Sequence, residues 1–228
     1  MGLTGLDARI IECEGCPRLR AYCREVARVK RRQFRDEDYW GKPVPGFGDP
    51  QARLLIVGLA PAAHGANRTG RMFTGDQSGL WLYRALYKAG FSNSPVSESR
   101  GDGLRLRDCY ITTAARCAPP ANKPLPEELQ RCGTWLSEEL LELKRIQVFL
   151  ALGKVALHAL WRRLPEDIKP GRALPAFAHG AEIPLNDGRV IVCSYHPSQQ
   201  NTFTGLLTEA MFDRVFEASR EHLRSGDF

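Results

Sequence analysis

The sequence lacks the apolar run that a membrane-spanning helix requires. Such a helix needs roughly 18 to 20 consecutive apolar residues, and no stretch of the 228 residues approaches that length. The segment Met1–Arg9 also lacks the basic-then-apolar order of a secretory signal peptide. We therefore expect a cytoplasmic protein with no membrane partner.

The chain also lacks the common glycine-rich nucleotide motifs. Residues 58–79 are rich in glycine, but they contain neither a Walker Gly-Lys-Ser/Thr element nor a G-x-G-x-x-G fingerprint. A phosphate or dinucleotide cradle is therefore not the reason for these glycines. The stretch follows an apolar run, residues 54–57, and precedes an amphipathic one, as expected for a strand, a long loop and a helix. Because ligands bind where loops leave the carboxyl ends of parallel strands, this loop is a candidate active site.

Acidic residues are scarce in residues 18–35. Eight basic side chains there accompany one acid, Glu25, and the whole chain has a formal net charge of +6. On a helix this run would present a cationic face, which either is simply solvated or follows a phosphate backbone with salt-sensitive affinity. The net charge favours a polyanionic partner only as a general tendency. The eight residues are Arg18, Arg20, Arg24, Arg28, Lys30, Arg31, Arg32 and Arg35.

The composition, 43% hydrophobic and 25% charged, is that of a globular protein long enough to bury one sizeable core. We expect a single domain over residues 1–228, with a helical, cysteine-bearing lead-in at 1–50 and an α/β core at 51–228. Strand and helix signals alternate in this core, which is the signature of a doubly wound parallel sheet. The expected strands are 53–58, 108–115, 146–152 and 190–195, and the expected helices are 80–89, 126–143, 154–164 and 206–223.

Seven cysteines in a chain without a secretion signal favour metal-binding or core roles over disulfides. Cys13 and Cys16 have the C-x-x-C spacing that lets two thiolates bind one ion or cluster. Cys109 and Cys193 lie in apolar strands, where we expect small core residues. Four thiolates serve both zinc and iron-sulfur clusters, so the spacing leaves the metal open. The candidates for two further ligands are Cys117 and Cys132, with Cys23 as their competitor.

A second polar loop follows the last expected strand. It reads Ser194-Tyr-His-Pro-Ser-Gln-Gln-Asn201 and precedes the final helix. His196 is placed there to donate a hydrogen bond or to act as an acid or base. The hydroxyl and amide side chains after it suit a sugar-phosphate backbone.

Three groups of motifs occur in a fixed order along the chain. They are Gly58-Leu-Ala-Pro-Ala with His64-Gly65, Asn67-Arg-Thr-Gly-Arg71 and Phe73-Thr-Gly-Asp76, then Arg116-Cys-Ala-Pro-Pro-Ala-Asn-Lys-Pro124, then Tyr195-His-Pro-Ser-Gln-Gln-Asn201. Together with the segment at residues 43–49, they resemble the type 5 uracil-DNA glycosylases, the UDGb family, over essentially the whole chain. The resemblance implies removal of deaminated bases from DNA. It also implies a four-stranded parallel sheet flanked by helices, with the N-terminal segment tied on by a [4Fe-4S] cluster. The implied cluster ligands are Cys13, Cys16, Cys117 and Cys132, and Cys23 has no ligand role in that pattern.

The chemistry of this reaction gives expected roles to individual side chains, and for His196 the resemblance implies the same role. Cleavage of the bond between deoxyribose and uracil builds positive charge on the sugar and negative charge on the base. His196 would donate to a carbonyl oxygen of the leaving base, and Asp76 would orient a water or balance the sugar. Phe73 would stack on the flipped base, and Asn122 would read its edge. Further expected substrate contacts are Gly58, Ala60 and His64, and the expected DNA contacts are Asn67, Arg68, Arg71, Gln199, Gln200 and Asn201.

Several of these residues have a second interpretation. Asp76 would also serve as a cap for the helix that begins near residue 78. His64 could instead bond the loop backbone, and the polar side chains of residues 67–71 could fix the loop to its own carbonyls. The first motif, residues 60–63, contains only apolar side chains, so none of them can activate a water molecule. These small side chains should leave room in the pocket, and the resemblance implies activity on hypoxanthine and some modified pyrimidines besides uracil.

Two other functional classes fit parts of the sequence. A non-catalytic nucleic-acid-binding module would use the basic run and a four-thiolate metal site. A metal-dependent hydrolase of small nucleotides would use His64, Asp76 and His196 as ligands, although their spacing is not typical of a metal site. For the glycosylase we expect a monomer that acts on DNA in a prokaryotic nucleoid, and a sliding clamp is a candidate recruiting partner.

Overall fold

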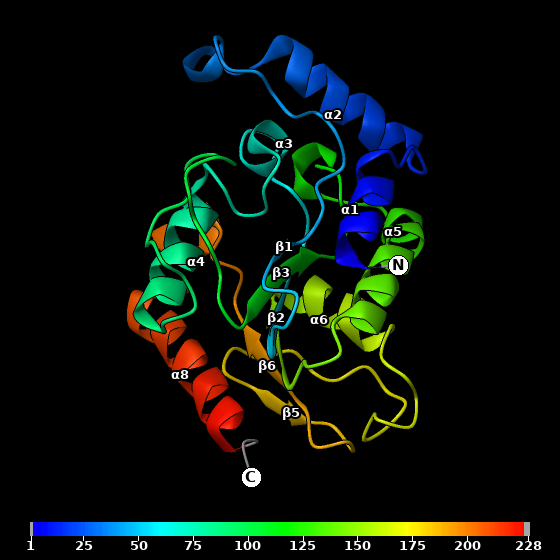
Figure 1. Cartoon of the computed structure of the whole chain (residues 1–228), viewed down its shortest axis with the longest axis vertical. Coiled ribbons are helices and arrows are strands. Elements are labelled where there is room, and N and C mark those ends of the chain that lie inside the picture. Colours follow the sequence, from blue (N-terminus) through cyan, green and yellow to red (C-terminus); the bar gives the residue numbers. More distant parts are fainter. Residues whose placement is uncertain (1, 226–228) are drawn as a thin grey trace.

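The computed structural model describes residues 2–225, which form a central sheet with helices on both faces (Figure 1). Within these residues the strand order is β1-β3-β2-β4-β6-β5, and the four central strands are parallel. Every residue of these four strands is buried, which explains their near-continuous apolar sequences. They confirm the four expected strands: β2 (Leu54–Gly58), β3 (Cys109–Thr113), β4 (Val148–Leu152) and β6 (Val190–Ser194).

The sheet is mixed and six-stranded, so the expectation of a purely parallel four-stranded sheet was wrong at the edges. β1 (Phe47–Gly48) pairs antiparallel with β3, and β5 (Glu182–Pro184) pairs antiparallel with β6. Both strands are very short, and neither contains a fully buried residue. Segments this short show no hydrophobic period, which is why the sequence did not reveal them. Short edge strands also limit pairing with other chains.

The alternation of side chains along the strands creates two cores. Leu54 and Ile56 face one core together with α4 (Gln77–Lys88) and α8 (Glu209–Ser225), whereas Leu55 and Val57 face the other. The second core is covered by α5 (Pro126–Glu142) and α6 (Lys154–Trp161), with α1 (Leu3–Ile11) packed on α5 (Figure 1). Cys109 lies in the first core and Cys193 in the second, which confirms both as core residues.

The N-terminal segment runs from α1, which packs on α5, to residues 31–34 at the carboxyl ends of the parallel strands. It contains α1, α2 (Pro17–Val29) and the short 3₁₀ helix η1 (Arg32–Phe34). α2 contacts the short helix α3 (Ala66–Thr69), and both lie at the same end of the molecule (Figure 1). None of the helices described in residues 2–225 has the length and apolarity to cross a membrane.

The helical part of the basic run does not form an uncompensated cationic face. Its four arginines are paired with glutamates of the N-terminal segment and of α5. Positive charge without an acidic side-chain partner is therefore concentrated after the helix ends, at residues 30–35, as far as the described residues show. The pairs are Arg18 with Glu128, Arg20 and Arg24 with Glu14, and Arg28 with Glu25.

Candidate active site

A cavity of about 880 Å³ opens where the parallel strands end. Its walls come from the loops after β2 and β3, from the end of β3 and from the loop after β6. This edge of a parallel sheet is the usual location of ligand sites. The cavity brings together eight of the residues predicted for the site: Ala60, His64, Phe73, Asp76, Asn122, His196, Gln199 and Gln200.

Phe73 forms an apolar wall over the end of β2. Its backbone has a φ of 53°, a left-handed conformation that is unfavourable for an aromatic residue. This turn lays the ring over Gly58, where an added Cβ would lie 2.8 Å from Phe73 Cζ. Gly58 therefore shapes the site by leaving room for the ring, and it is not among the residues that line the cavity.

His196 lies beside Phe73, with the ring centroids 5.9 Å apart and the planes tilted by 31°. Its backbone carbonyl accepts hydrogen bonds from the Ser198 N–H and the Asn201 side chain, both at 2.8 Å. Asn201 thus holds the histidine loop, and it does not line the cavity. Burial lowers the pKa of His196 to about 4, so the imidazole is neutral near pH 7 and donates from one ring nitrogen only.

Asp76 is the N-cap of α4 and also lines the cavity. Its Oδ1 accepts a hydrogen bond from the Gly79 N–H at 2.9 Å, so the predicted capping role is confirmed. Its Oδ2 lies against Gly65, where any Cβ would collide with it. Burial raises the pKa of the carboxyl, while bonds from the Gly79 and Ser78 N–H groups oppose that shift.

His64 is held by the N-terminal segment. Its Nδ1 is 3.0 Å from the Tyr39 hydroxyl, and the two rings meet edge to face. Burial lowers the pKa of His64, and the nearby Arg31 and Arg68 lower it further. The imidazole therefore lines the cavity in its neutral form near pH 7.

Arg68 is buried and bound within the protein. Its guanidinium donates to the carbonyls of His64 and Gly75, pairs with Glu37 and stacks on Phe34 at 3.8 Å from the ring centroid. These bonds connect the two halves of the first loop to the N-terminal segment. They agree with the loop-fixing interpretation of this residue.

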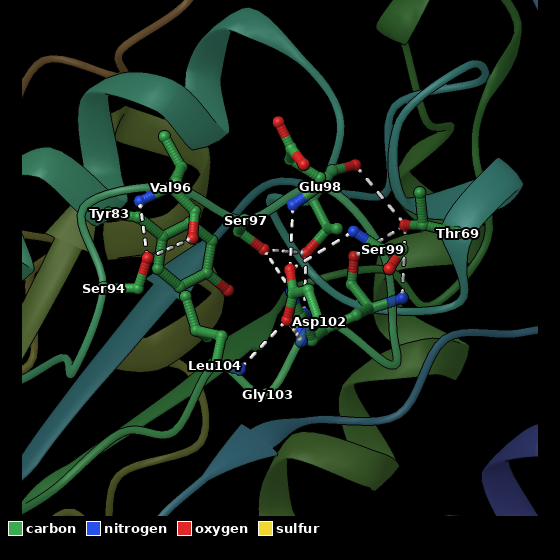
Figure 2. A network of polar contacts seen from close by, with 12 residues as sticks. Thr69, Tyr83, Ser94, Val96, Ser97, Glu98, Ser99, Asp102, Gly103 and Leu104 are labelled. Atoms are coloured by element: carbon green, nitrogen blue, oxygen red, sulfur yellow. Dashed lines mark hydrogen bonds and ion pairs between the residues drawn. The ribbon is translucent and has the colours of Figure 1, made fainter.

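Arg71 is likewise internal, with 4% of its surface exposed. It forms a two-point ion pair with Asp102 at 2.8 and 2.5 Å, and it donates to the Ser97 hydroxyl. Asp102 also accepts three backbone N–H bonds, from Glu98, Ser99 and Leu104 (Figure 2). The charge of Arg71 is therefore fully compensated inside the fold.

Asn67 completes this group of internal residues. It is fully buried, and its side-chain amide donates to the carbonyls of Cys23 and Ala63, both at 3.4 Å. Direct DNA contact by residues 67, 68 and 71 does not fit this burial, which favours the loop-fixing interpretation of all three.

Asn122 sits on a strained turn at the cavity wall. Ala121 and Asn122 both have a positive φ, 52° and 56°, within the short helix η2 (Pro120–Asn122). Consecutive left-handed residues other than glycine cost energy and occur mainly where function requires them. The side chain of Asn122 is exposed toward the cavity, as a base-reading role requires.

The lining also includes residues that the sequence did not indicate. They come from the segment after α2, from the end of β3, from the turn after η2 and from the start of α7 (Gln199–Phe203). Ser198 and Lys123 lie in the polar loop motifs and Arg31 lies in the basic run, but no pattern assigned them to this cavity, and none marked the others. These residues are Arg31, Gln33, Phe34, Thr113, Lys123 and Ser198.

The four predicted cluster cysteines come from three separate segments and influence one another. Burial, together with Cys16 and Cys13, raises the pKa of Cys132 to about 11. Contact with Cys23 and burial raise the pKa of Cys117, to which Cys132 also contributes. Within residues 2–225, no three His, Cys, Asp or Glu side chains are arranged to hold a metal ion. His64, Asp76 and His196 share the cavity without forming such a group.

Comparison with known proteins identifies relatives along nearly the whole chain. Residues 45–220 match the family model of the Uracil DNA glycosylase superfamily. The type-5 uracil-DNA glycosylase of Thermus thermophilus is 53% identical over 211 residues, covering 91% of this chain and 93% of that protein. The Mycobacterium bovis type-5 enzyme is 50% identical over 217 residues, which is 95% of this chain and 80% of that protein. The Pyrobaculum aerophilum type-5 enzyme is 48% identical over 200 residues, or 88% and 84%.

Proposed function

Because the chain belongs to the uracil DNA glycosylase superfamily, with type-5 relatives over nearly its whole length, we propose that it is a DNA-repair enzyme that excises uracil. It hydrolyses the N-glycosidic bond and leaves an abasic site. The observation that carries this function is the single cavity that unites Phe73, Asp76, Asn122 and His196 at the carboxyl ends of the strands. A base must leave the duplex to reach a cavity of this kind.

The chemistry divides between the two ends of the scissile bond. His196 is neutral and donates a hydrogen bond to a carbonyl oxygen of the base as negative charge develops there. Phe73, at 5.9 Å from that ring, supplies the face on which the base stacks. Desolvation of the donor in the cavity strengthens this interaction because less water competes for the oxygen.

Asp76 acts at the sugar end of the bond. Its capping bond fixes the carboxylate, and its second oxygen faces the space beside Gly65. An ionised carboxylate there orients a water molecule or balances the oxocarbenium-like sugar. No side chain of residues 60–63 offers an alternative acid or base, because all four are Ala or Pro.

The small side chains of residues 60–63 also bear on substrate range. Ala60, Pro61, Ala62 and Ala63 line the cavity without a polar group that would reject a larger or differently substituted base. A hydrophobic wall discriminates weakly between bases of different size or substitution. We therefore propose that hypoxanthine and some modified pyrimidines are excised as well.

We also propose a [4Fe-4S] cluster on Cys13, Cys16, Cys117 and Cys132. Three of these thiols are buried, and the Arg116 N–H donates to the Cys132 sulfur at 3.2 Å, as suits a thiolate ligand. In a cluster each thiolate would bind a different iron, so the four sulfurs need not surround one ion. The lack of a single-ion site among the described residues is therefore compatible with a cluster. When bound, the cluster supplies four iron–thiolate links that tie the N-terminal segment to the loop after β3 and to α5.

Iron content tests this cofactor proposal. The purified protein should contain about four iron atoms per chain and show the visible absorbance of a cluster, and Cys13→Ser should lose both and also bind DNA less tightly. Cys23→Ala is the matched control, because Cys23 is buried beside Cys117 but bonds the Ala118 carbonyl at 3.6 Å. Loss of iron in Cys23→Ala with retention in Cys13→Ser would overturn the ligand assignment.

The glycosylase function is tested with a labelled oligonucleotide that carries one uracil, incubated with chelator present and then treated with alkali. Scission at the uracil that appears only after alkali indicates a monofunctional glycosylase. An oligonucleotide with thymine in place of uracil is the control, and scission of one that carries hypoxanthine tests the substrate range. DNA that stays intact although the protein binds it would favour the non-catalytic module instead, and cleavage lost only with chelator would favour the metal-dependent hydrolase.

A further inference from the structure

The internal position of the two loop arginines leaves the phosphates of the DNA backbone without an assigned cationic partner. Arg68 and Arg71 have all their charge compensated by Glu37, Asp102 and backbone carbonyls. The arginines of α2 are paired with glutamates as well. A protein that accepts a flipped nucleotide must still bind the phosphates on either side of it.

Two cationic side chains at the cavity meet this requirement. Arg31 precedes η1 in the N-terminal segment, and Lys123 follows η2 in the loop after β3. Both are exposed, and both line the cavity. In residues 2–225 neither side chain forms an ion pair or hydrogen bond, since only their backbone groups are bonded. Arg31 also influences the pKa of His64 electrostatically, which places its charge near the cavity.

The rest of the lining makes these two cations distinctive. The wall formed by Gln199 and Gln200 is uncharged, and Asp76 is the one acid in the lining formed by the described residues. Other basic residues of the same run, such as Arg32 and Arg35, do not line the cavity. Arg31 and Lys123 lie far apart in sequence, and the fold brings their two charges to the same cavity.

We propose that Arg31 and Lys123 each bind a phosphate of the strand that carries the target base, one on each side of the flipped nucleotide. This inference rests on the proposed glycosylase function, because it assumes a nucleotide in the cavity. The damaged strand then crosses the opening from the N-terminal segment to the loop after β3. The uncharged glutamines face the gap left in the duplex.

The salt dependence of binding tests the two contacts. Affinity is measured at several salt concentrations for an oligonucleotide with a stable abasic-site analogue, which the enzyme cannot process. Each phosphate contact contributes about 0.7 to 0.9 to the slope of log affinity against log salt. Arg31→Ala and Lys123→Ala should each lower the slope by that amount, and the double variant by about twice as much.

Matched controls remove the same charge at the opposite edge of the sheet. Lys144 and Arg145 lie in the exposed turn before β4, away from the cavity, and the control variants are Arg145→Ala and Lys144→Ala. They should leave the slope unchanged. Equal effects from both pairs of variants, or no effect from Arg31→Ala and Lys123→Ala, would overturn the proposal.

Removing the charge of one phosphate identifies which of the two cations binds it. Replacing the phosphate on one side of the abasic site by a methylphosphonate should weaken binding by the unaltered protein but not by the variant that already lacks the matching cation. Additive losses for both cations at both phosphates would contradict the assignment. Uracil release by the unaltered protein is measured in parallel, so a failure of the glycosylase function is seen separately from a failure of these contacts.

Discussion

The two roles of Asp76 can be separated by a pair of substitutions. Its Oδ1 accepts the capping bond from the Gly79 N–H at 2.9 Å, while its second oxygen lies beside Gly65. Asp76→Asn keeps an acceptor oxygen for the cap but removes the ionisable carboxylate. Asp76→Ala removes both.

The expected stabilities differ because Asn and Asp are comparable N-caps. Asp76→Asn should change the free energy of unfolding by less than about 0.5 kcal/mol, whereas Asp76→Ala should lower it by about 1 kcal/mol. In a chain of this size that loss corresponds to a melting temperature roughly 2 to 4 °C lower. Urea denaturation and thermal melts measure both quantities.

The expected activities, in contrast, are alike. Both variants lack the carboxylate, so the single-turnover rate of uracil release should fall about tenfold or more in each. If Asp76→Asn cleaves as fast as the unaltered protein, the carboxylate has no part in the reaction and Asp76 is only a cap. Circular dichroism at the assay temperature excludes unfolding as the cause of a loss.

The pH dependence of the rate of uracil release is a second test of the role of Asp76. Burial raises the pKa of the Asp76 carboxyl, so the rate should fall on the acid side through a pKa above the usual 3.8. The His196 imidazole, with a pKa of about 4, also takes up a proton at the acid end, so the two groups are separated by substitution. Asp76→Asn should lose the part of the limb that the carboxylate causes, and a limb of unchanged position and depth in that variant would contradict the assignment.

Three further predictions follow from the geometry. Desolvation lowers the pKa of His196 to about 4, so the unfolded chain binds a proton near pH 6.5 that the folded protein binds only near pH 4. The free energy of unfolding should thus fall as the pH falls through that window, by up to about 1.4 kcal/mol per unit, and His196→Asn should remove this contribution in urea titrations and also slow uracil release. Gly58→Ala should displace the Phe73 ring and weaken substrate affinity in a KM measurement, with an unchanged KM contradicting the stacking role. Asp102→Asn leaves the buried Arg71 uncompensated and should cost about 3 kcal/mol in urea denaturation, and a loss below about 1 kcal/mol would show that the pair matters little.

The core of the fold was predictable because burial leaves a continuous apolar signal. β2 and β4 are short apolar runs bounded by polar or turn residues, so their existence and order could be predicted. β1 and β5 could not, because strands of two and three half-exposed residues have no period to detect. The cavity was predictable for a related reason. Each polar motif follows a strand, and parallel strands deliver their following loops to one edge.

Whether each charged residue is buried and ion-paired, or exposed, was not predictable in the same way. Arg71 is neutralised by Asp102 and Arg68 by Glu37, each 31 positions away in sequence, through loops whose path no local pattern specifies. The sequence therefore indicated a basic loop where the structure has two buried, compensated arginines. Conversely, Arg31 stood within a run of eight basic residues, and only the fold separates it from its paired neighbours.

The backbone strain of the site explains why these buried arginines are needed. Five non-glycine residues in the described part of the chain have a positive φ, and three of them, Phe73, Ala121 and Asn122, line the cavity. Such conformations persist only where surrounding contacts over-determine them. Arg68 ties the carbonyls of His64 and Gly75 on either side of this loop, and Arg71 bonds the Thr74 hydroxyl directly after Phe73. Arg68 and Arg71 thus support the site from inside the fold, because they hold the aromatic ring and the carboxylate in a geometry that the loop alone would relax.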